Sequence, residues 1–172
     1  MSEVKQIKEH QVIIGLGSNI SPEENLRSAL YLLGRYAPIE AISGVWQTRA
    51  VGSKGPDFLN AAVIISTPLS NDDLRNQILR PVENLLGRVR TKDPNAPRTI
   101  DLDILIVNGE LIDQDLWKYA HACVPVAQLI PDFHNPVTGE SIRIIADRLI
   151  ETDSIKQSSL EFYRTSPTRD IG

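Results

Sequence analysis

The first hundred residues alternate between short apolar runs and apolar residues at helical spacing. Runs rich in β-branched residues predict strands, whereas apolar residues three or four positions apart predict helices. The expected strands cover 12–16, 39–48, 58–67 and 99–107, and the expected helices cover 22–35 and a stretch that begins at Ser70. This β-α-β-β-α-β order predicts an α+β, ferredoxin-like fold: a split β-α-β unit with an antiparallel sheet and helices packed on one face.

Local signals mark the ends of several elements. Ser21-Pro22-Glu23-Glu24 predicts an N-cap, a proline at the first helical position and a capping-box glutamate. Pro81 lies inside the second helix and predicts a kink there. Asn108-Gly109 predicts a tight turn after the fourth strand.

Beyond Gly109 the pattern is weaker. It predicts a helix near 140–150 and a polar tail over 151–172, with no internal repeat. A chain of 172 residues has a one-domain length, so we expect a single domain over 1–172.

Composition excludes several classes of protein. One cysteine excludes a disulfide framework and a Cys-type structural zinc site. No apolar run approaches the roughly 20 residues of a membrane span, so we expect a cytoplasmic protein without a membrane partner. A net charge of −4 argues against a nucleic-acid partner, and nothing in the sequence determines the oligomeric state.

Two aspartates in the fourth strand carry the strongest chemical signal. Alternation places Asp101 and Asp103 on one face, with Cα atoms about 6.8 Å apart, and Ile100, Leu102, Ile104 and Ile106 on the other. Two carboxylates at that separation repel by roughly 2 kcal/mol, and a divalent cation would remove the repulsion. Magnesium prefers one or two carboxylates together with substrate phosphates. The alternative is a pair of solvated or arginine-paired aspartates.

A basic cluster precedes these aspartates. Arg88, Arg90, Lys92 and Arg98 lie within eleven residues of an otherwise acidic chain. Arginine matches phosphate oxygens in geometry, so cations beside a carboxylate pair favour a polyphosphate with its metals. An ordinary solvated loop is the alternative.

Phe58 and Asn60 share one face of the third strand. A ring beside an amide suits a flat heteroaromatic ligand, although a core phenylalanine beside a turn-bonding asparagine gives the same pattern. The chain has neither a dinucleotide-binding fingerprint nor a P-loop, and its three histidines are scattered.

Several motifs together resemble the 6-hydroxymethyl-7,8-dihydropterin pyrophosphokinase family. The similarity runs from 12 to 109 and rests on Gly15-Leu16-Gly17-Ser18-Asn19, Thr48 with Gly52, Pro56-Asp57-Phe58-Leu59-Asn60, Gly87-Arg88-Val89-Arg90 and Ala96-Pro97-Arg98-Thr99-Ile100-Asp101-Leu102-Asp103. The resemblance implies a ferredoxin-like fold. It also implies transfer of pyrophosphate from ATP to a pterin alcohol in folate synthesis, with release of AMP.

The resemblance also implies roles for individual residues. Asp101 and Asp103 would hold two magnesium ions, and with Arg88 and Arg98 they would form the catalytic set. The nucleotide would contact Glu83, Arg88, Arg90, Arg98 and Ile104. The pterin would contact Gly17, Thr48, Ala50, Val51, Phe58 and Asn60.

The chain departs from the family after Gly109, where a segment with a Pro-His-Pro-like motif is not present. His121 falls where a second stacking aromatic residue is expected, and we assign it to the pterin. We expect the loops 49–57 and 88–97 to cover the site in place of that segment. The departure leaves two alternatives: a catalytically weak pterin- or nucleotide-binding relative, and another metal-dependent nucleotidyl transferase.

Overall fold

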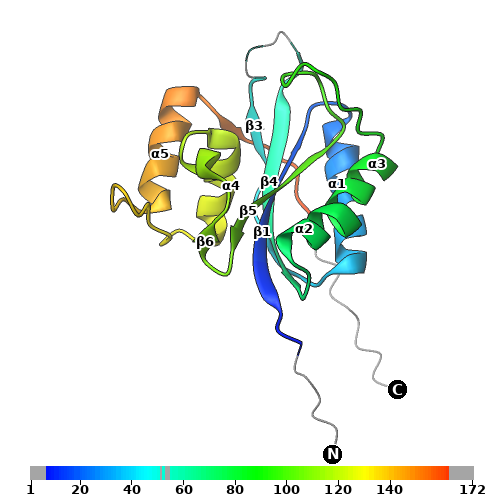
Figure 1. Cartoon of the computed structure of the whole chain (residues 1–172). Helices are drawn as coiled ribbons and strands as arrows, with labels where there is room; N and C mark the ends of the chain where they lie inside the picture. The colour runs from blue at the N-terminus through cyan, green and yellow to red at the C-terminus, as the bar shows by residue number, and fades with distance from the viewer. Residues whose placement is uncertain (1–6, 51, 53–54, 163–172) are drawn as a thin grey trace, which may run out of the picture.

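A computed structural model describes residues 7–50, 52 and 55–162 of the chain. Seven strands form one sheet in the order β6-β5-β1-β4-β3-β7, and β2 also pairs with β4 (Figure 1). All of its strand pairs are antiparallel. The strands are β1 (His10–Ser18), β2 (Ile39–Ile42), β3 (Trp46–Thr48), β4 (Phe58–Thr67), β5 (Asp101–Val107), β6 (Glu110–Leu111) and β7 (Lys156–Gln157).

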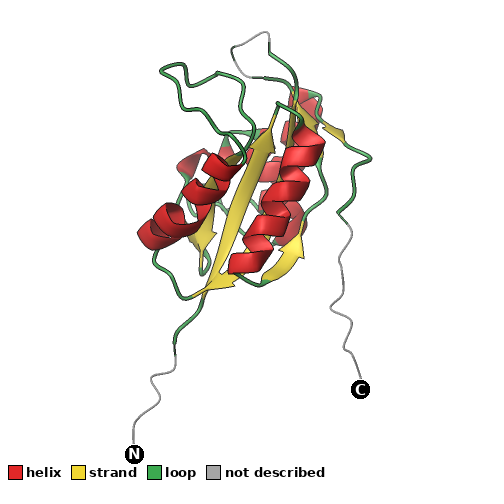
Figure 2. Cartoon of the chain, turned by 90° about the vertical axis from the view of Figure 1, so that its right-hand side faces the viewer, coloured by secondary structure: helices red, strands yellow, loops and turns green. Residues whose placement is uncertain are grey.

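Helices cover both faces of this sheet. On one face lie α1 (Pro22–Tyr36), α2 (Asn71–Leu74), the π-helical turn η1 (Arg75–Leu79) and α3 (Arg80–Leu85), as Figure 2 shows. On the other face lie α4 (Ala120–Leu129) and α5 (Ile142–Asp153), and the short 3-10 helix η2 (Gln114–Trp117) precedes α4. The predicted ferredoxin-like unit, with its two helical segments on one face of the antiparallel sheet, is confirmed, and α4 and α5 add a layer on the other face. The helix near 140–150 is also confirmed, as α5, whereas α4 was not predicted.

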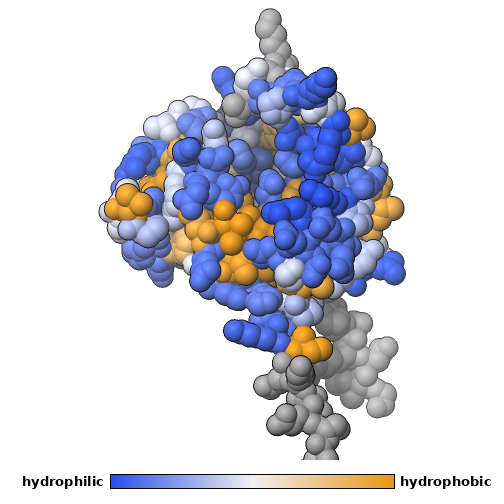
Figure 3. Space-filling model, viewed as in Figure 1, coloured by the Kyte–Doolittle hydropathy of each residue, from blue (hydrophilic) through white to orange (hydrophobic). Residues whose placement is uncertain are grey.

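Two hydrophobic cores result from alternation along the central strands. Val12, Ile14 and Leu16 of β1 face α1 and α3, whereas Ile13 between them faces α4 and α5. β1 pairs with β4 on one side and with β5 on the other, so β1 lies in the interior of the sheet. The face shown in Figure 3 is mostly hydrophilic, with an apolar area near its centre and smaller ones at its edges, because most large apolar side chains lie in the two cores.

A β-bulge corrects the predicted face of Ile106. Ile13 pairs with Ile106 but Ile14 pairs with Ile104, so Leu105 is an extra residue in β5. Ile104 therefore packs with α1 and α3 as predicted, whereas Leu105 and Ile106 both pack on the α4 side. The predicted sharing of one face by all four apolar residues is wrong only at Ile106.

The start of α1 differs from prediction, and the chain leaves regular α-helical geometry just ahead of Pro81. Ser21 precedes α1 with φ 41° and its side chain makes no capping hydrogen bond, so the predicted side-chain N-cap is wrong. Ahead of Pro81 the helix widens into a π-helical turn, in which the Arg80 N–H donates to the carbonyl of Arg75. Because Pro81 has no N–H to donate within the helix, the regular hydrogen-bond pattern is interrupted there, and the interruption takes the form of this wider turn.

The single strand predicted over 39–48 is two strands, β2 and β3. Between them, the Ser43 hydroxyl accepts a hydrogen bond from the Ala62 N–H at 2.8 Å, and the Ser43 N–H donates to the Ala62 carbonyl at 2.9 Å. Through Ser43 the chain between β2 and β3 therefore stays hydrogen-bonded to β4, and it changes direction there toward Thr48.

The first part of the expected polar tail returns to the sheet. β7 pairs with β3 through Lys156 and Gln157, and Leu160 is buried in the core beneath α1. In the described residues no helix is long and apolar enough to cross a membrane.

Candidate functional site

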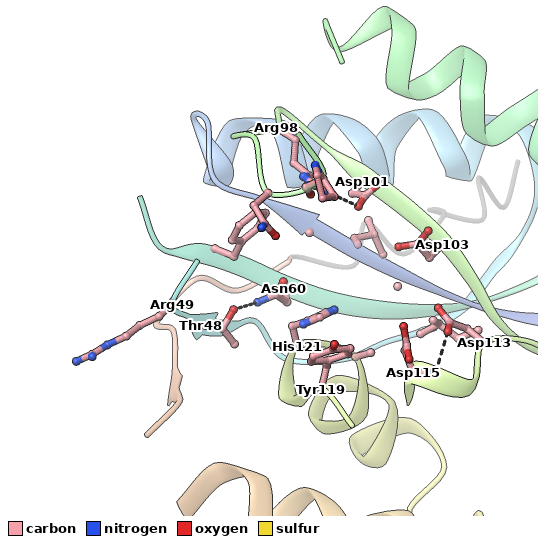
Figure 4. A pocket seen from close by; sticks show the side chains of 18 residues that line it. Thr48, Arg49, Asn60, Arg98, Asp101, Asp103, Asp113, Asp115, Tyr119 and His121 are labelled. Atoms are coloured by element: carbon pink, nitrogen blue, oxygen red, sulfur yellow. Dashed lines mark hydrogen bonds and ion pairs between the residues drawn. The ribbon is translucent and has the colours of Figure 1, made fainter. Parts of the chain in front are cut away.

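A pocket of about 420 Å³ opens at one end of the sheet, which is a size typical of small-molecule sites (Figure 4). β1, β4 and β5 form its floor, and loops and the start of α4 form its walls. The pocket is lined by Gly15, Leu16, Gly17, Thr48, Arg49, Phe58, Asn60, Pro94, Asn95, Arg98, Asp101, Asp103, Leu105, Asp113, Asp115, Tyr119, His121 and Ala122. Eight residues predicted for the site meet here: Gly17, Thr48, Phe58, Asn60, Arg98, Asp101, Asp103 and His121.

Asn60 is fixed at the neutral end of the pocket. Its Nδ2 donates to the Thr48 hydroxyl at 2.9 Å and to the Trp46 carbonyl at 3.2 Å. Both amide hydrogens have acceptors, so Oδ1 is left as an acceptor. A Cβ on Gly17 would lie 3.1 Å from that oxygen, so glycine keeps the space in front of it open.

Phe58 lies two residues before Asn60 on β4 and lines the same pocket. The Arg98 guanidinium carbon lies 5.9 Å from the centroid of its ring. This contact joins the aromatic end of the pocket to the charged end.

The strand register brings the two aspartates opposite glycines. Asp101 pairs with Gly17 and Asp103 with Gly15, so no side chain of β1 shields either carboxylate on this face. Asp101 is held by Arg98 at 2.8 Å and by Arg88 at 3.9 Å. The Asp103 carboxylate has neither a hydrogen bond nor an ion pair with any described residue.

Asp103 is electrostatically strained. Desolvation by the surrounding pocket and, after it, the neighbouring carboxylates Asp101 and Asp113 together raise its pKa from 3.8 to about 7, while Arg98 opposes the shift. A cation at this carboxylate would remove the strain.

Asp113, Asp115 and Tyr119 line the pocket but were not predicted. Asp113 caps η2, where its carboxylate accepts the Asp115 N–H at 2.9 Å. Asp113-x-Asp115 repeats the spacing of the first aspartate pair, and that repetition is the signal that could have revealed them. They come from the segment after Gly109, where we expected a departure from the family, and this segment supplies a wall of the site.

His121 faces the pocket from the first turn of α4, as Figure 4 shows. The Tyr119 ring stacks on its imidazole, with centroids 5.4 Å apart and planes 19° apart. Burial lowers the pKa of His121, so the ring favours its neutral form. A neutral flat ring across the pocket from β4 suits a flat ligand.

The two loops expected to cover the site both reach it. Arg49 comes from one loop and Pro94 and Asn95 from the other. A Cβ on Gly52 would lie 3.0 Å from the amide nitrogen of Asn95, so the loops approach each other closely there.

Some predicted residues lie outside the pocket lining. Ala50 is half-buried in the loop, and Val51 lies outside the described residues. Arg88 reaches Asp101 from outside the pocket, and Arg90 forms an ion pair with Glu83. The Ile104 side chain is buried in the core against the helices.

The donor set at the aspartates fits magnesium. Within the described residues no three histidine, cysteine or acidic side chains form a group that could hold a metal on their own. Two carboxylates on one strand face supply hard oxygen donors and leave the remaining positions for water and phosphate. The site is therefore suited to a metal that arrives with a phosphate ligand.

Comparisons with known proteins agree with this geometry. The family model described as 7,8-dihydro-6-hydroxymethylpterin-pyrophosphokinase (HPPK) matches residues 13–131. A 2-amino-4-hydroxy-6-hydroxymethyldihydropteridine pyrophosphokinase of Synechocystis is 33% identical over 144 residues, which cover 77% of this chain and 73% of the relative. The protein of the same name from Bacillus subtilis is 41% identical over 112 residues, which cover 63% of this chain and 66% of the relative.

A solved structure shares the fold. Plasmodium falciparum HPPK-DHPS aligns with a TM-score of 0.69 at 11% identity, over 87% of this chain and 48% of that chain. This chain thus spans about half the length of that protein. Taken with the match over residues 13–131, these similarities show that the chain belongs to the 7,8-dihydro-6-hydroxymethylpterin-pyrophosphokinase family.

Proposed function

We propose that this chain transfers pyrophosphate from ATP to 6-hydroxymethyl-7,8-dihydropterin and releases AMP, with magnesium held by Asp101 and Asp103. The family and its relatives are named for this activity, which belongs to folate synthesis. The observation that carries the assignment is the pocket itself. It joins an aromatic and amide end, which suits a pterin, to a carboxylate and arginine end, which suits a metal polyphosphate.

The neutral end would orient the pterin. Asn60 Oδ1 accepts an N–H from the edge of the heterocycle, because the Asn60 amide group is already committed to Thr48 and Trp46. Phe58 on the floor and His121 on the wall formed by the start of α4 offer flat surfaces, and Gly17 permits close approach. Backbone groups of Ala50 and Val51 would complete the edge contacts.

The charged end would orient the triphosphate. Arg98 lines the pocket and holds Asp101, so it lies where phosphate oxygens would approach the carboxylates, and Arg88 supports Asp101 from outside the pocket lining. Arg90 extends this positive surface. When bound, magnesium would neutralise phosphate charge and acidify the attacking hydroxyl.

The transfer is an in-line displacement. The pterin hydroxymethyl oxygen forms a bond to the β-phosphorus of ATP, the bond from that phosphorus to the α–β bridging oxygen breaks, and AMP leaves with that oxygen. The hydroxyl proton is lost to solvent. The protein's share is to position the reactants and exclude water, since phosphoryl transfer asks little covalent chemistry of side chains.

Incubation of the chain with ATP, magnesium and 6-hydroxymethyl-7,8-dihydropterin tests the proposal. We expect equal amounts of AMP and pterin pyrophosphate. Pterin binding without AMP would select the weak binding relative, and AMP formation with other acceptors but not with the pterin would select another nucleotidyl transferase.

A further inference from the structure

Glu83 is a buried carboxylate outside the pocket. It lies on α3 with 3% of its surface exposed, and it is the sole acidic residue in the buried class among the described parts of the chain. A buried carboxylate is costly unless it is bonded to donors, so its position calls for a physical reason.

One carboxylate oxygen binds the backbone of the aspartate strand. Oε1 accepts the N–H of Leu102 at 3.0 Å, and Leu102 is the residue between Asp101 and Asp103. β1 lines one edge of β5, but on the other edge β6 reaches only Ile106 and Val107. The Leu102 N–H therefore lies where β6 offers no partner, and Glu83 supplies the acceptor in its place.

The rest of Glu83 binds the basic loop. Oε2 accepts a hydrogen bond from Arg90 Nη2 at 2.7 Å, and the Glu83 carbonyl accepts the Arg88 N–H at 2.9 Å. Arg88 in turn reaches Asp101 at 3.9 Å. A single residue thus connects the strand that carries both aspartates to the loop that carries the arginines.

We propose that Glu83, in place of the direct nucleotide contact that the family resemblance implies, is a positioning residue, which holds β5 and the basic loop in the register needed to bind a magnesium nucleotide. The proposal deepens the proposed function and rests on it. Since the Leu102 N–H lies between the two carboxylates, release of this bond frees both to shift together. The Arg90 contact couples the same shift to the arginines.

Glu83→Ala tests the proposal, with Asn84→Ala, an exposed neighbour on the same helix, as the matched control. We expect Glu83→Ala to weaken binding of magnesium with a methylene-bridged ATP analogue by about 10–100-fold, the range found when a residue that orients metal ligands is lost. The affinity for the pterin, titrated with the analogue present, should change little, because Phe58 and Asn60 are untouched. Hydrogen exchange at the Leu102 amide should accelerate, whereas Asn84→Ala should match the wild type in all three measurements.

Glu83→Gln separates positioning from general loss of structure. Glutamine keeps an oxygen acceptor for Leu102, so this variant should restore slow exchange at Leu102 and most of the nucleotide affinity lost in Glu83→Ala. Equal loss in both variants with slow Leu102 exchange, or wild-type nucleotide affinity in Glu83→Ala, would overturn the proposal. Binding and exchange need no turnover, so absence of AMP from the wild type would refute the proposed function alone.

Discussion

At one end of the pocket Asn60 donates hydrogen bonds to Thr48 and Trp46, whereas at the other end the Asp103 carboxylate faces other carboxylates and has no bonded partner among the described residues. The first end is neutral and already arranged for its ligand. The second end holds unbalanced negative charge that only a cation can relieve. The two ends therefore bind their ligands by different interactions. The first end recognises shape and hydrogen-bonding groups, and the second end binds a cation that neutralises its carboxylates.

The largest effect should follow from neutralising the charged end. Asp101→Asn and Asp103→Asn each remove a charge that attracts magnesium, and we expect turnover to fall by about a hundredfold or more. Initial rates of AMP formation measure the loss. Near-normal turnover in both variants would contradict the metal assignment.

Thermal unfolding of the metal-free variants should distinguish the two aspartates. The folded-state pKa of Asp103 is raised from 3.8 to about 7, so its ionisation lowers stability as the pH rises through that window. Above pH 7, Asp103→Asn should raise the Tm. Asp101→Asn should lower it, because Arg98 and Arg88 lose their shared partner. The same shift in both variants would show that the two carboxylates are equivalent.

At the neutral end, Phe58→Ala should weaken pterin binding by on the order of 1–3 kcal/mol through lost stacking. Titration of pterin in the presence of magnesium and a methylene-bridged ATP analogue measures this change. Phe58→Leu keeps apolar bulk but no ring, so it should recover little of the loss. A comparable loss of nucleotide affinity in Phe58→Ala would indicate damage to the fold instead.

A smaller effect is expected at the opposite wall. His121→Ala should cost about 0.5–1.5 kcal/mol of pterin affinity, the range of one aromatic contact. His121→Phe restores a flat ring beside Tyr119 and should recover most of it. A pterin complex with the His121 ring far from the pterin plane, or a Phe variant as weak as the Ala variant, would rule out stacking.

The sequence predicted the parts of the molecule that depend on local spacing. Alternation placed Asp101 and Asp103 on one face, and i, i+2 spacing paired Phe58 with Asn60. It failed at Ile106, because a bulge inserts Leu105 in response to the pairing with β1, and pairing is not a local property.

The residues that sequence reasoning missed depend on tertiary contacts. Asp113 and Asp115 join the site only because η2 folds back against β5, where the Asp113 N–H donates to the Leu105 carbonyl at 3.3 Å. Glu83 was expected at the nucleotide from the family resemblance, but its contact with Leu102, which spans 19 positions between a helix and a strand edge, was not predicted. The repeated Asp-x-Asp spacing marks Asp113 and Asp115 themselves, but no periodicity in the sequence marks the contact of either segment with β5.

The pH dependence of nucleotide affinity tests the difference between the two ends most directly. With magnesium saturating, the affinity for an ATP analogue with a methylene α–β bridge can be compared at pH 6 and pH 8. Because protons compete for Asp103 with a pKa of about 7, the account predicts roughly tenfold weaker binding at pH 6 in the wild type. Phe58→Ala should show the same ratio. Equal affinity at the two pH values in the wild type would contradict the account.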